Sequence, residues 1–123
     1  MGLGTDLVHI ERFERLISRY GDRLAKKILS DEEFSGYANS VDKAGYIARR
    51  FAAKEATVKA IGTGFRYGIS KKEIAVAHDE NGKPILVTTG KADIFMKKLG
   101  ASHAWISLSD DTHYALCTVI LEN

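Results

Sequence analysis

The sequence contains one cysteine, Cys117, and it lacks any long apolar run. A single cysteine forms neither a disulfide within the chain nor a cysteine-based zinc site. No apolar stretch approaches the length of a membrane span, and the N-terminal residues carry no basic leader. We therefore expect a cytoplasmic protein without a membrane partner.

A strong net charge is also missing. The chain carries 18 Lys and Arg residues against 16 Asp and Glu residues, a formal net charge of +2, which is too weak to indicate a nucleic-acid partner. The charge is unevenly distributed, however, since cations outnumber anions between Arg12 and Lys27. Such a local basic face favours an acidic macromolecular partner or phosphate groups, although it is also typical of a solvated helix.

The length of the chain, 123 residues, predicts one domain spanning residues 1–123, because it is too short for two ordinary cores. A core of this size is modest. If part of this core gives way to an active-site cleft, little stability is left. We therefore hypothesise that a neighbouring subunit completes the site.

Helix signals dominate the first half of the chain. Ser30 and Glu33 form a capping-box pattern, Asp42 can open a long helix, and Gly62 stands where a glycine is expected just past a helix C-terminus. The expected elements are a strand at 3–8 and helices at about 10–20, 22–29, 30–39 and 42–61.

Strand signals dominate the second half. The Asn81-Gly82 pair between two apolar runs predicts a β-hairpin. The expected elements are strands at 73–78 and 84–89, a helix at 91–99, and strands at 103–109 and 113–121. The chain should therefore be an α+β protein, with N-terminal helices and a long central helix packed on a mainly antiparallel sheet. The other face of that sheet needs cover, and a second copy of the protein is an economical source.

Two charged residues, Glu55 and Lys59, lie one turn apart in the central helix. Small or apolar residues occupy nearly every side of this helix between Ala44 and Ile61, which is typical of a helix buried on more than one side. Glu and Lys are seldom fully buried unless they are paired or bound to something. The two charges therefore indicate either chemistry or an i,i+4 pair at a helix edge, worth about 0.3–0.5 kcal/mol.

Asp6 stands at the end of the first expected strand. Alone, it could cap the helix that follows. If the strand packs beside the central helix, however, Asp6 and Glu55 can share one divalent cation. The lack of a His and Cys cluster points to a hard, oxygen-ligated metal such as Mg²⁺, and Lys59 would then face phosphate groups on the same ligand.

A glycine-rich loop runs from Gly62 to Gly68, directly after the central helix. Its spacing matches neither the dinucleotide-binding fingerprint nor the Walker A loop. Three glycines in this loop can admit the phosphates of a ligand, or they can merely turn the chain.

Several motifs occur together and in a characteristic order. They are Gly2-Leu3-Gly4-Thr5-Asp6-Leu7-Val8, Arg12, Arg50-Phe51-Ala52-Ala53-Lys54-Glu55-Ala56 with Lys59-Ala60, Gly62-Thr63-Gly64, Asn81-Gly82-Lys83-Pro84 and Ser107-Leu108-Ser109. Over essentially the whole chain, this set resembles the holo-acyl-carrier-protein synthases, which are small bacterial-type 4′-phosphopantetheinyl transferases. The resemblance implies transfer of phosphopantetheine from coenzyme A to a serine of apo-acyl carrier protein, with release of adenosine 3′,5′-bisphosphate. It further implies a requirement for Mg²⁺, a role in fatty acid biosynthesis, and a homotrimer with active sites at the subunit interfaces.

The resemblance also implies roles for individual residues. Asp6 and Glu55 match the metal ligands of the family, Lys59 matches its catalytic lysine, and all three belong to the catalytic set. The residues assigned to coenzyme A are Arg50, Lys59, Gly62, Gly64, Lys83, Pro84 and Ser109. Those matching the basic positions that face the acidic helix of the carrier protein are Arg12, Arg23 and Lys27.

One position departs from the family pattern. Many members have His directly after the Ser-Leu-Ser segment, where this chain has Asp110, and an aspartate cannot be assumed to do the same work. Two other functions stay open from the residues alone. An Mg²⁺-dependent nuclease also uses Asp, Glu and Lys, but usually on a strand at alternating spacing. A non-catalytic adaptor could bind an acidic protein through residues 12–27, but that leaves Glu55 and Lys59 without a role.

Overall fold

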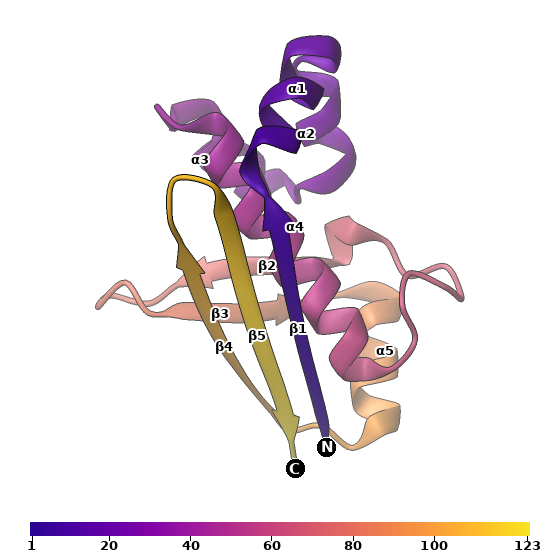
Figure 1. Ribbon diagram of the computed structural model, residues 1–123. Coiled ribbons are helices and arrows are strands. Elements are labelled where there is room, and N and C mark those ends of the chain that lie inside the picture. Colours follow the sequence, from indigo (N-terminus) through magenta and orange to yellow (C-terminus); the bar gives the residue numbers. More distant parts are fainter.

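The computed structural model describes all residues from 1 to 123, and its elements follow the order that the sequence predicts (Figure 1). The N-terminal half contains β1 (Gly2–His9), α1 (Ile10–Tyr20), α2 (Asp22–Ile28), α3 (Asp31–Asn39) and α4 (Lys43–Ile61). The C-terminal half contains the 3-10 turn η1 (Lys71–Glu73), β2 (Ile74–His78), β3 (Pro84–Thr88), α5 (Gly90–Leu99), β4 (His103–Asp110) and β5 (Tyr114–Glu122). The expected α+β class is confirmed. None of the helices combines the length and the apolar character that a membrane span requires.

Local signals in the sequence set the ends of two helices. Ser30 and Glu33 form the predicted capping box at the start of α3, each side chain accepting a hydrogen bond from the backbone N–H of the other. Asp42 accepts a hydrogen bond from the N–H of Gly45 and begins α4. Gly62, with a φ of 91°, ends α4 in the left-handed conformation that glycine adopts without steric cost.

The strands form two antiparallel sheets instead of one. The larger sheet has the order β1-β5-β4, and β2 pairs with β3 in a separate hairpin. The predicted turn at Asn81-Gly82 is confirmed, because β2 and β3 pair directly across it. β3 lies near β4, but no ladder of backbone hydrogen bonds joins the two sheets.

Helix α4 covers one face of the larger sheet and packs mainly on β1 and β5 (Figure 1). Alternate side chains of a strand point to opposite faces, and β5 follows this period closely. The β5 side chains turned toward α4 and buried in the core are Ala115, Cys117, Val119 and Leu121. The predicted packing of the long helix on an antiparallel sheet is therefore confirmed.

Two glycines allow β1 to lie directly on the backbone of α4. A Cβ atom on Gly2 would collide with the carbonyl group of Ala60, and one on Gly4 would collide with that of Ala56. A glycine within a strand often marks such a close approach of two backbones. Asp6 is the next residue on the same face of β1, so the contact also carries its carboxylate toward α4.

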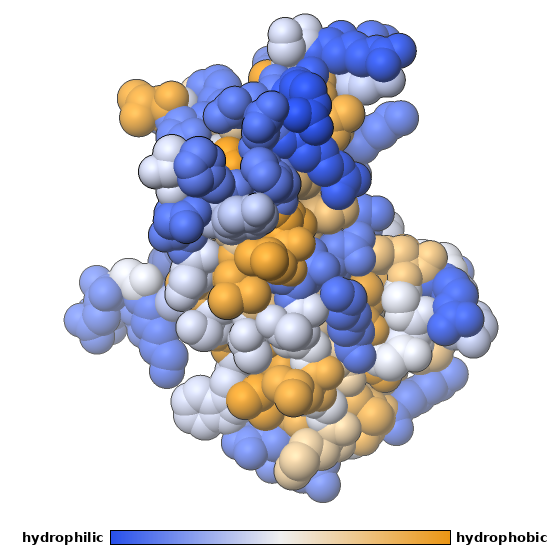
Figure 2. Space-filling model, in the orientation of Figure 1, coloured by the Kyte–Doolittle hydropathy of each residue, from blue (hydrophilic) through white to orange (hydrophobic).

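The opposite face of the larger sheet is apolar and has no cover within the chain. Leu3 and Leu7 on β1 are 69% and 60% exposed. Leu3 pairs with Ile120, which pairs in turn with Trp105, so one apolar row crosses all three strands. Figure 2 shows hydrophobic patches over β1 and β5 on this face. The sequence-based expectation that one face of the sheet needs cover from elsewhere matches this exposed surface.

A buried ion pair joins α4 to α3 and to the β2–β3 hairpin. Lys54 is fully buried, and its Nζ donates to Glu33 Oε1 at 2.7 Å, to the carbonyl oxygen of Lys71 at 3.0 Å and to that of Ile74. Glu33 Oε2 accepts a hydrogen bond from the N–H of Val76 at 3.0 Å. Burial lowers the pKa of Lys54, and the charge of Glu33 opposes that shift. All three ammonium donors have partners, so the pair fixes α3, α4, η1 and β2 relative to one another.

The variant Glu33→Gln should lower the free energy of unfolding by about 3–5 kcal/mol, because it leaves the ammonium group of Lys54 buried without a counter-charge. Urea unfolding followed by circular dichroism measures the change. Glu32→Gln is the matched control, since Glu32 is exposed in the same helical turn and should shift stability by no more than about 0.5 kcal/mol. Similar small shifts in both variants would contradict the structural importance of the pair.

Candidate active site

Asp6 and Lys59 meet at the β1 edge of the larger sheet. Lys59 Nζ donates to Asp6 Oδ1 at 2.9 Å and to the carbonyl oxygen of Thr5 at 3.0 Å. The Lys59 side chain is 52% exposed, whereas that of Asp6 is 15% exposed. The cation therefore lies at the rim of the site, and the carboxylate lies beneath it. The predicted proximity of the first strand and the central helix is confirmed by this contact.

Glu55 lies one turn before Lys59 on α4. Residues four apart share a helix face, so Glu55 projects from the same side of α4 as Lys59. Glu55 is partly buried, and its carboxylate makes no hydrogen bond or ion pair with another protein group. Its oxygens are therefore available to a ligand.

The donor atoms at this edge suit a hard cation. Asp6 and Glu55 offer only carboxylate oxygens. Cys117 is the cross-strand neighbour of Asp6, but burial, reinforced by the charge of Asp6, raises the pKa of its thiol to about 12, so the thiol stays protonated and does not act as a ligand. No group of three or more His, Cys, Asp or Glu side chains is arranged to hold a metal ion. Two carboxylates nevertheless fit Mg²⁺, which usually keeps several water or phosphate oxygens as ligands.

The glycine-rich loop begins one turn beyond Lys59. Gly62 and Gly64 have φ angles of 91° and 62°, and no heavy atom lies within 4 Å of a Cβ built on either. The backbone N–H groups of Gly62, Thr63 and Gly64 all donate to the carbonyl oxygen of Val58. These amide groups are already used in ending helix α4. The two glycines therefore offer open space beside Lys59, but the loop does not offer free N–H donors to a phosphate group.

Arg50 lies on a different side of α4. Its guanidinium stacks over the Tyr46 ring at 4.2 Å, and its Nε lies 3.8 Å from Glu33 Oε2. The side chain is 9% exposed, and the buried Nε has no hydrogen-bond partner. None of its polar contacts involves Asp6 or Lys59, so within one protomer the structure does not bring Arg50 together with them.

Lys83 and Pro84 lie on the β2–β3 hairpin. Lys83 Nζ sits 5.1 Å from the centre of the Trp105 ring on β4, and Pro84 begins β3 opposite His78. Burial, and then the positive charge of Arg50, lower the pKa of His78. Arg50 reaches the same region through Glu33, whose Oε2 lies 3.8 Å from Arg50 Nε and accepts a hydrogen bond from the N–H of Val76 on β2.

Ser109 and Asp110 lie at the end of β4, on the same side of the molecule as Arg50 and the β2–β3 hairpin. Asp110 Oδ2 accepts a hydrogen bond from Arg49 Nη1 at 3.0 Å. Ser109 and Asp110 also line a hollow of about 360 Å³ on the outer face of the sheet. The sequence motifs assign no role to Arg49, although it stands directly before Arg50.

The assigned residues thus form two groups on different edges of one protomer. The first group, at the β1 edge, contains Asp6, Glu55, Lys59 and the loop 62–64. The second group, toward the β2–β3 hairpin and β4, contains Arg50, Lys83, Pro84 and Ser109. Within one protomer no hydrogen bond or ion pair joins the two groups, and β5 stands between β1 and β4.

The basic residues assigned to a partner lie on α1 and α2. Arg12 is exposed and stacks over the ring of Phe51 at 5.2 Å. Arg23 and Lys27 line a hollow of about 420 Å³ together with Tyr20 and Leu24. All three cations therefore lie on the helical end of the molecule.

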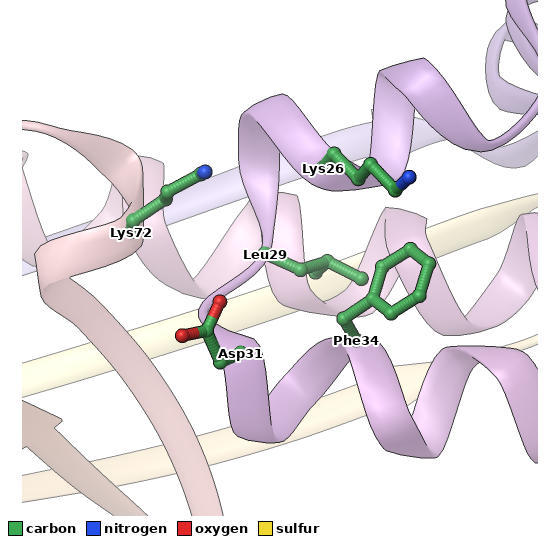
Figure 3. A pocket seen from close by; sticks show the side chains of 5 residues that line it. All are labelled: Lys26, Leu29, Asp31, Phe34 and Lys72. Carbon is green, nitrogen blue, oxygen red and sulfur yellow. The ribbon is translucent and has the colours of Figure 1, made fainter.

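A second hollow, of about 390 Å³, extends this basic surface toward η1. In Figure 3, Lys26 from α2 and Lys72 from η1 lie around the apolar side chains of Leu29 and Phe34, and the carboxylate of Asp31 shares the hollow. Lys72 was not singled out from the sequence, because it lies outside the run of cations at residues 12–27. The structure brings it beside that run through the packing of η1 against α2.

Comparisons of the sequence and of the structure with known proteins each give matches that cover nearly the whole chain. The sequence profile of the 4′-phosphopantetheinyl transferase superfamily matches residues 2–119. A holo-[acyl-carrier-protein] synthase of Aliivibrio salmonicida is 46% identical over 123 residues, which cover 100% of this chain and 98% of the relative. The crystal structure of the Neisseria meningitidis holo-[acyl-carrier-protein] synthase superposes with a TM-score of 0.92 at 36% identity, covering 99% of this chain and 98% of the other. That of the Bacillus anthracis enzyme, in complex with CoA (3′,5′-ADP), has a TM-score of 0.80 at 30% identity and covers 98% and 94%.

Proposed function

The chain belongs to the 4′-phosphopantetheinyl transferase superfamily, and from this membership we propose how its residues share the work of the reaction. The enzyme transfers the 4′-phosphopantetheine group of coenzyme A to a serine of apo-acyl carrier protein and releases adenosine 3′,5′-bisphosphate. The full-length match to holo-[acyl-carrier-protein] synthases is the observation that carries this function. It leaves no ground for the nuclease and adaptor alternatives.

We propose that Asp6 and Glu55 hold Mg²⁺. When bound there, the ion neutralises the pyrophosphate oxygens of coenzyme A. Lys59 stabilises negative charge on the transferring or leaving phosphate, and its ammonium group is already held at the site by Asp6. Phosphoryl transfer depends mainly on positioning and charge neutralisation, and these three side chains offer both. The unpartnered carboxylate of Glu55 supports this assignment.

In the same proposal, Arg50 binds a phosphate group of coenzyme A. Its guanidinium is nearly buried and yet donates no hydrogen bond to the protein, and arginine matches the geometry of phosphate oxygens well. Gly62 and Gly64 leave room for the ligand beside Lys59. The residues proposed to hold the nucleotide end are Lys83, Pro84 and Ser109.

We further propose that the enzyme is a homotrimer whose subunits complete one another's sites. A head-to-tail contact between the β1 edge of one subunit and the opposite edge of the next unites the two groups of residues. Contacts of this kind generate a closed ring when the rotation closes. The exposed apolar row of Leu3, Ile120 and Trp105 supports such an interface, because large exposed apolar patches mark interaction surfaces.

The basic surface on α1 and α2 is proposed to bind the acidic carrier protein. Arg12, Arg23 and Lys27 supply its cations, and the hollow between Lys26 and Lys72 extends it (Figure 3). Opposite charges steer partners together and raise the association rate. Residues 1–123 then act as one transferase domain in the cytoplasm, without a nucleic-acid or membrane partner, and supply holo-carrier protein for fatty acid biosynthesis.

The metal assignment predicts that Glu55→Gln lowers the transfer rate by on the order of 100-fold, since charge neutralisation at the reacting phosphate is lost. Intact-mass analysis of apo-acyl carrier protein, incubated with coenzyme A and Mg²⁺, measures the rate. A chelator should abolish the mass gain for the wild-type enzyme. Glu32→Gln removes an exposed carboxylate and serves as the control, while thermal unfolding tests that both variants fold. Near-normal turnover by Glu55→Gln would overturn the assignment.

The docking assignment predicts that Arg12→Glu combined with Arg23→Glu raises the apparent KM for carrier protein by about 10-fold or more, because charge reversal turns electrostatic attraction into repulsion. The KM for coenzyme A should stay nearly unchanged. The effect should shrink as salt is added. Lys98→Glu, a reversal at an exposed position on α5, is the control. Equal effects on both substrates would refute the division of labour.

The trimer assignment predicts that Leu3→Asp combined with Ile120→Asp converts trimer to monomer, because it places charge in the apolar row, and that transfer is lost as a result. Size-exclusion chromatography with light scattering measures the oligomeric state. Ile94→Asp changes an apolar residue on α5 that is 51% exposed, and it should leave the trimer intact. An active monomer would contradict the shared site.

Mixing two impaired variants tests the same point without disturbing the interface. Glu55→Gln removes a residue of one group, and Arg50→Ala removes a residue of the other. After refolding together, roughly a quarter of the interfaces combine both intact groups by random assortment. Recovered activity is expected, and the absence of any recovery would place both groups in the same subunit's site.

A further inference from the structure

Arg50 retains an uncompensated positive charge although it lies beside a carboxylate. Glu33 Oε1 is already taken by Lys54 Nζ at 2.7 Å and by the N–H of Ser30 at 3.1 Å, and Oε2 accepts from Val76. The separation of 3.8 Å between Arg50 Nε and Glu33 Oε2 is beyond hydrogen-bond range. One carboxylate thus serves two cations and holds Arg50 by attraction without occupying its donors.

The ring of Tyr46 forms a platform beneath this guanidinium. Tyr46 lies one turn before Arg50 on α4, and the guanidinium stacks 4.2 Å above the ring, in the range of a cation–π contact. The hydroxyl group donates to the carbonyl oxygen of Glu33 at 2.7 Å. Burial raises the pKa of Tyr46, so the hydroxyl stays protonated and keeps this donor role. The far end of the ring is therefore tied to α3 while its face carries the arginine.

We propose that Tyr46 and Glu33 are positioning residues that hold Arg50 in place for a phosphate group of coenzyme A. This inference rests on the proposed phosphate role of Arg50. The hydrogen bond between the Tyr46 hydroxyl and the Glu33 carbonyl keeps the ring under the guanidinium, and the Glu33 carboxylate keeps the guanidinium from swinging away. A pre-ordered arginine loses less conformational freedom on binding, which favours affinity for coenzyme A.

A double-mutant cycle on the full-length enzyme tests the proposal. The variants are Tyr46→Phe, Arg50→Ala and the two combined, with steady-state KM and kcat measured for coenzyme A and for apo-acyl carrier protein. Tyr46→Phe keeps the ring and removes only the hydroxyl. It should raise the KM for coenzyme A about 5- to 10-fold, the size of one lost hydrogen bond, with kcat and the KM for carrier protein nearly unchanged. In the Arg50→Ala background it should have no further effect, because Tyr46 then has nothing to position.

Tyr37→Phe is the matched control. Its hydroxyl is also buried but has no hydrogen-bond partner, and its ring lies 6.3 Å from that of Tyr46. The substitution removes the same atom from the same aromatic cluster without breaking a hydrogen bond. The KM for coenzyme A should stay within about twofold of the wild-type value.

The outcomes separate this inference from the function on which it rests. An unchanged KM for coenzyme A in Arg50→Ala overturns the phosphate role of Arg50, and the positioning role with it. A raised KM in Arg50→Ala together with an unchanged KM in Tyr46→Phe overturns the positioning role alone. So does an equal rise from Tyr46→Phe in both backgrounds, since that pattern reports a general structural effect.

Discussion

The direct contact between the backbone of β1 and the carbonyl groups of α4 is the constraint on which the first half of the site depends. Only glycine fits at positions 2 and 4. A shift of β1 by one residue would place the side chain of Leu3 or Thr5 against the helix backbone, and these side chains are too large to fit there. A one-residue slip moves a whole strand's side chains to the opposite face. The fixed register therefore keeps Asp6 turned inward, where Lys59 reaches it.

Helix α4 carries residues of both proposed groups, but on different sides of the helix. Arg50 and Glu55 are five residues apart, which separates their directions by about 140° around the helix axis. The Glu55 side faces the β1 edge, while the Arg50 side is tied to α3 and β2 through Glu33 and Lys54. A rigid helix cannot turn both sides toward one ligand. This separation supports the proposal that a second subunit completes the site, and the uncovered apolar face of the sheet offers the surface for it.

Local patterns were enough to predict the order of the elements, the capping box, the hairpin and the meeting of Asp6 with the central helix. They missed the charge that is most deeply buried. The apolar surroundings of Glu55 and Lys59 suggest burial of these two charges, but Lys54 is the fully buried residue. Its partner Glu33 lies 21 positions away and already had a complete explanation as part of a capping box. A residue that satisfies a local rule gives no sign of a second, long-range partner. The pairing of Arg49 with Asp110 joins residues 61 positions apart, and no local pattern indicates it.

The contrast between Arg49 and Arg50 shows how the fold separates two adjacent cations. Arg49 is paired with Asp110, whose Oδ2 lies 3.0 Å from Arg49 Nη1. The carboxylate of Asp110 therefore neutralises the guanidinium of Arg49. Arg50 faces a carboxylate that Lys54 has already neutralised. Of two neighbouring guanidinium groups, one is held in an ion pair and the other keeps its charge and its donors. The region beside the β2–β3 hairpin therefore contains one uncompensated cation, Arg50. An uncompensated cation is the electrostatic condition that binding of a phosphate group needs.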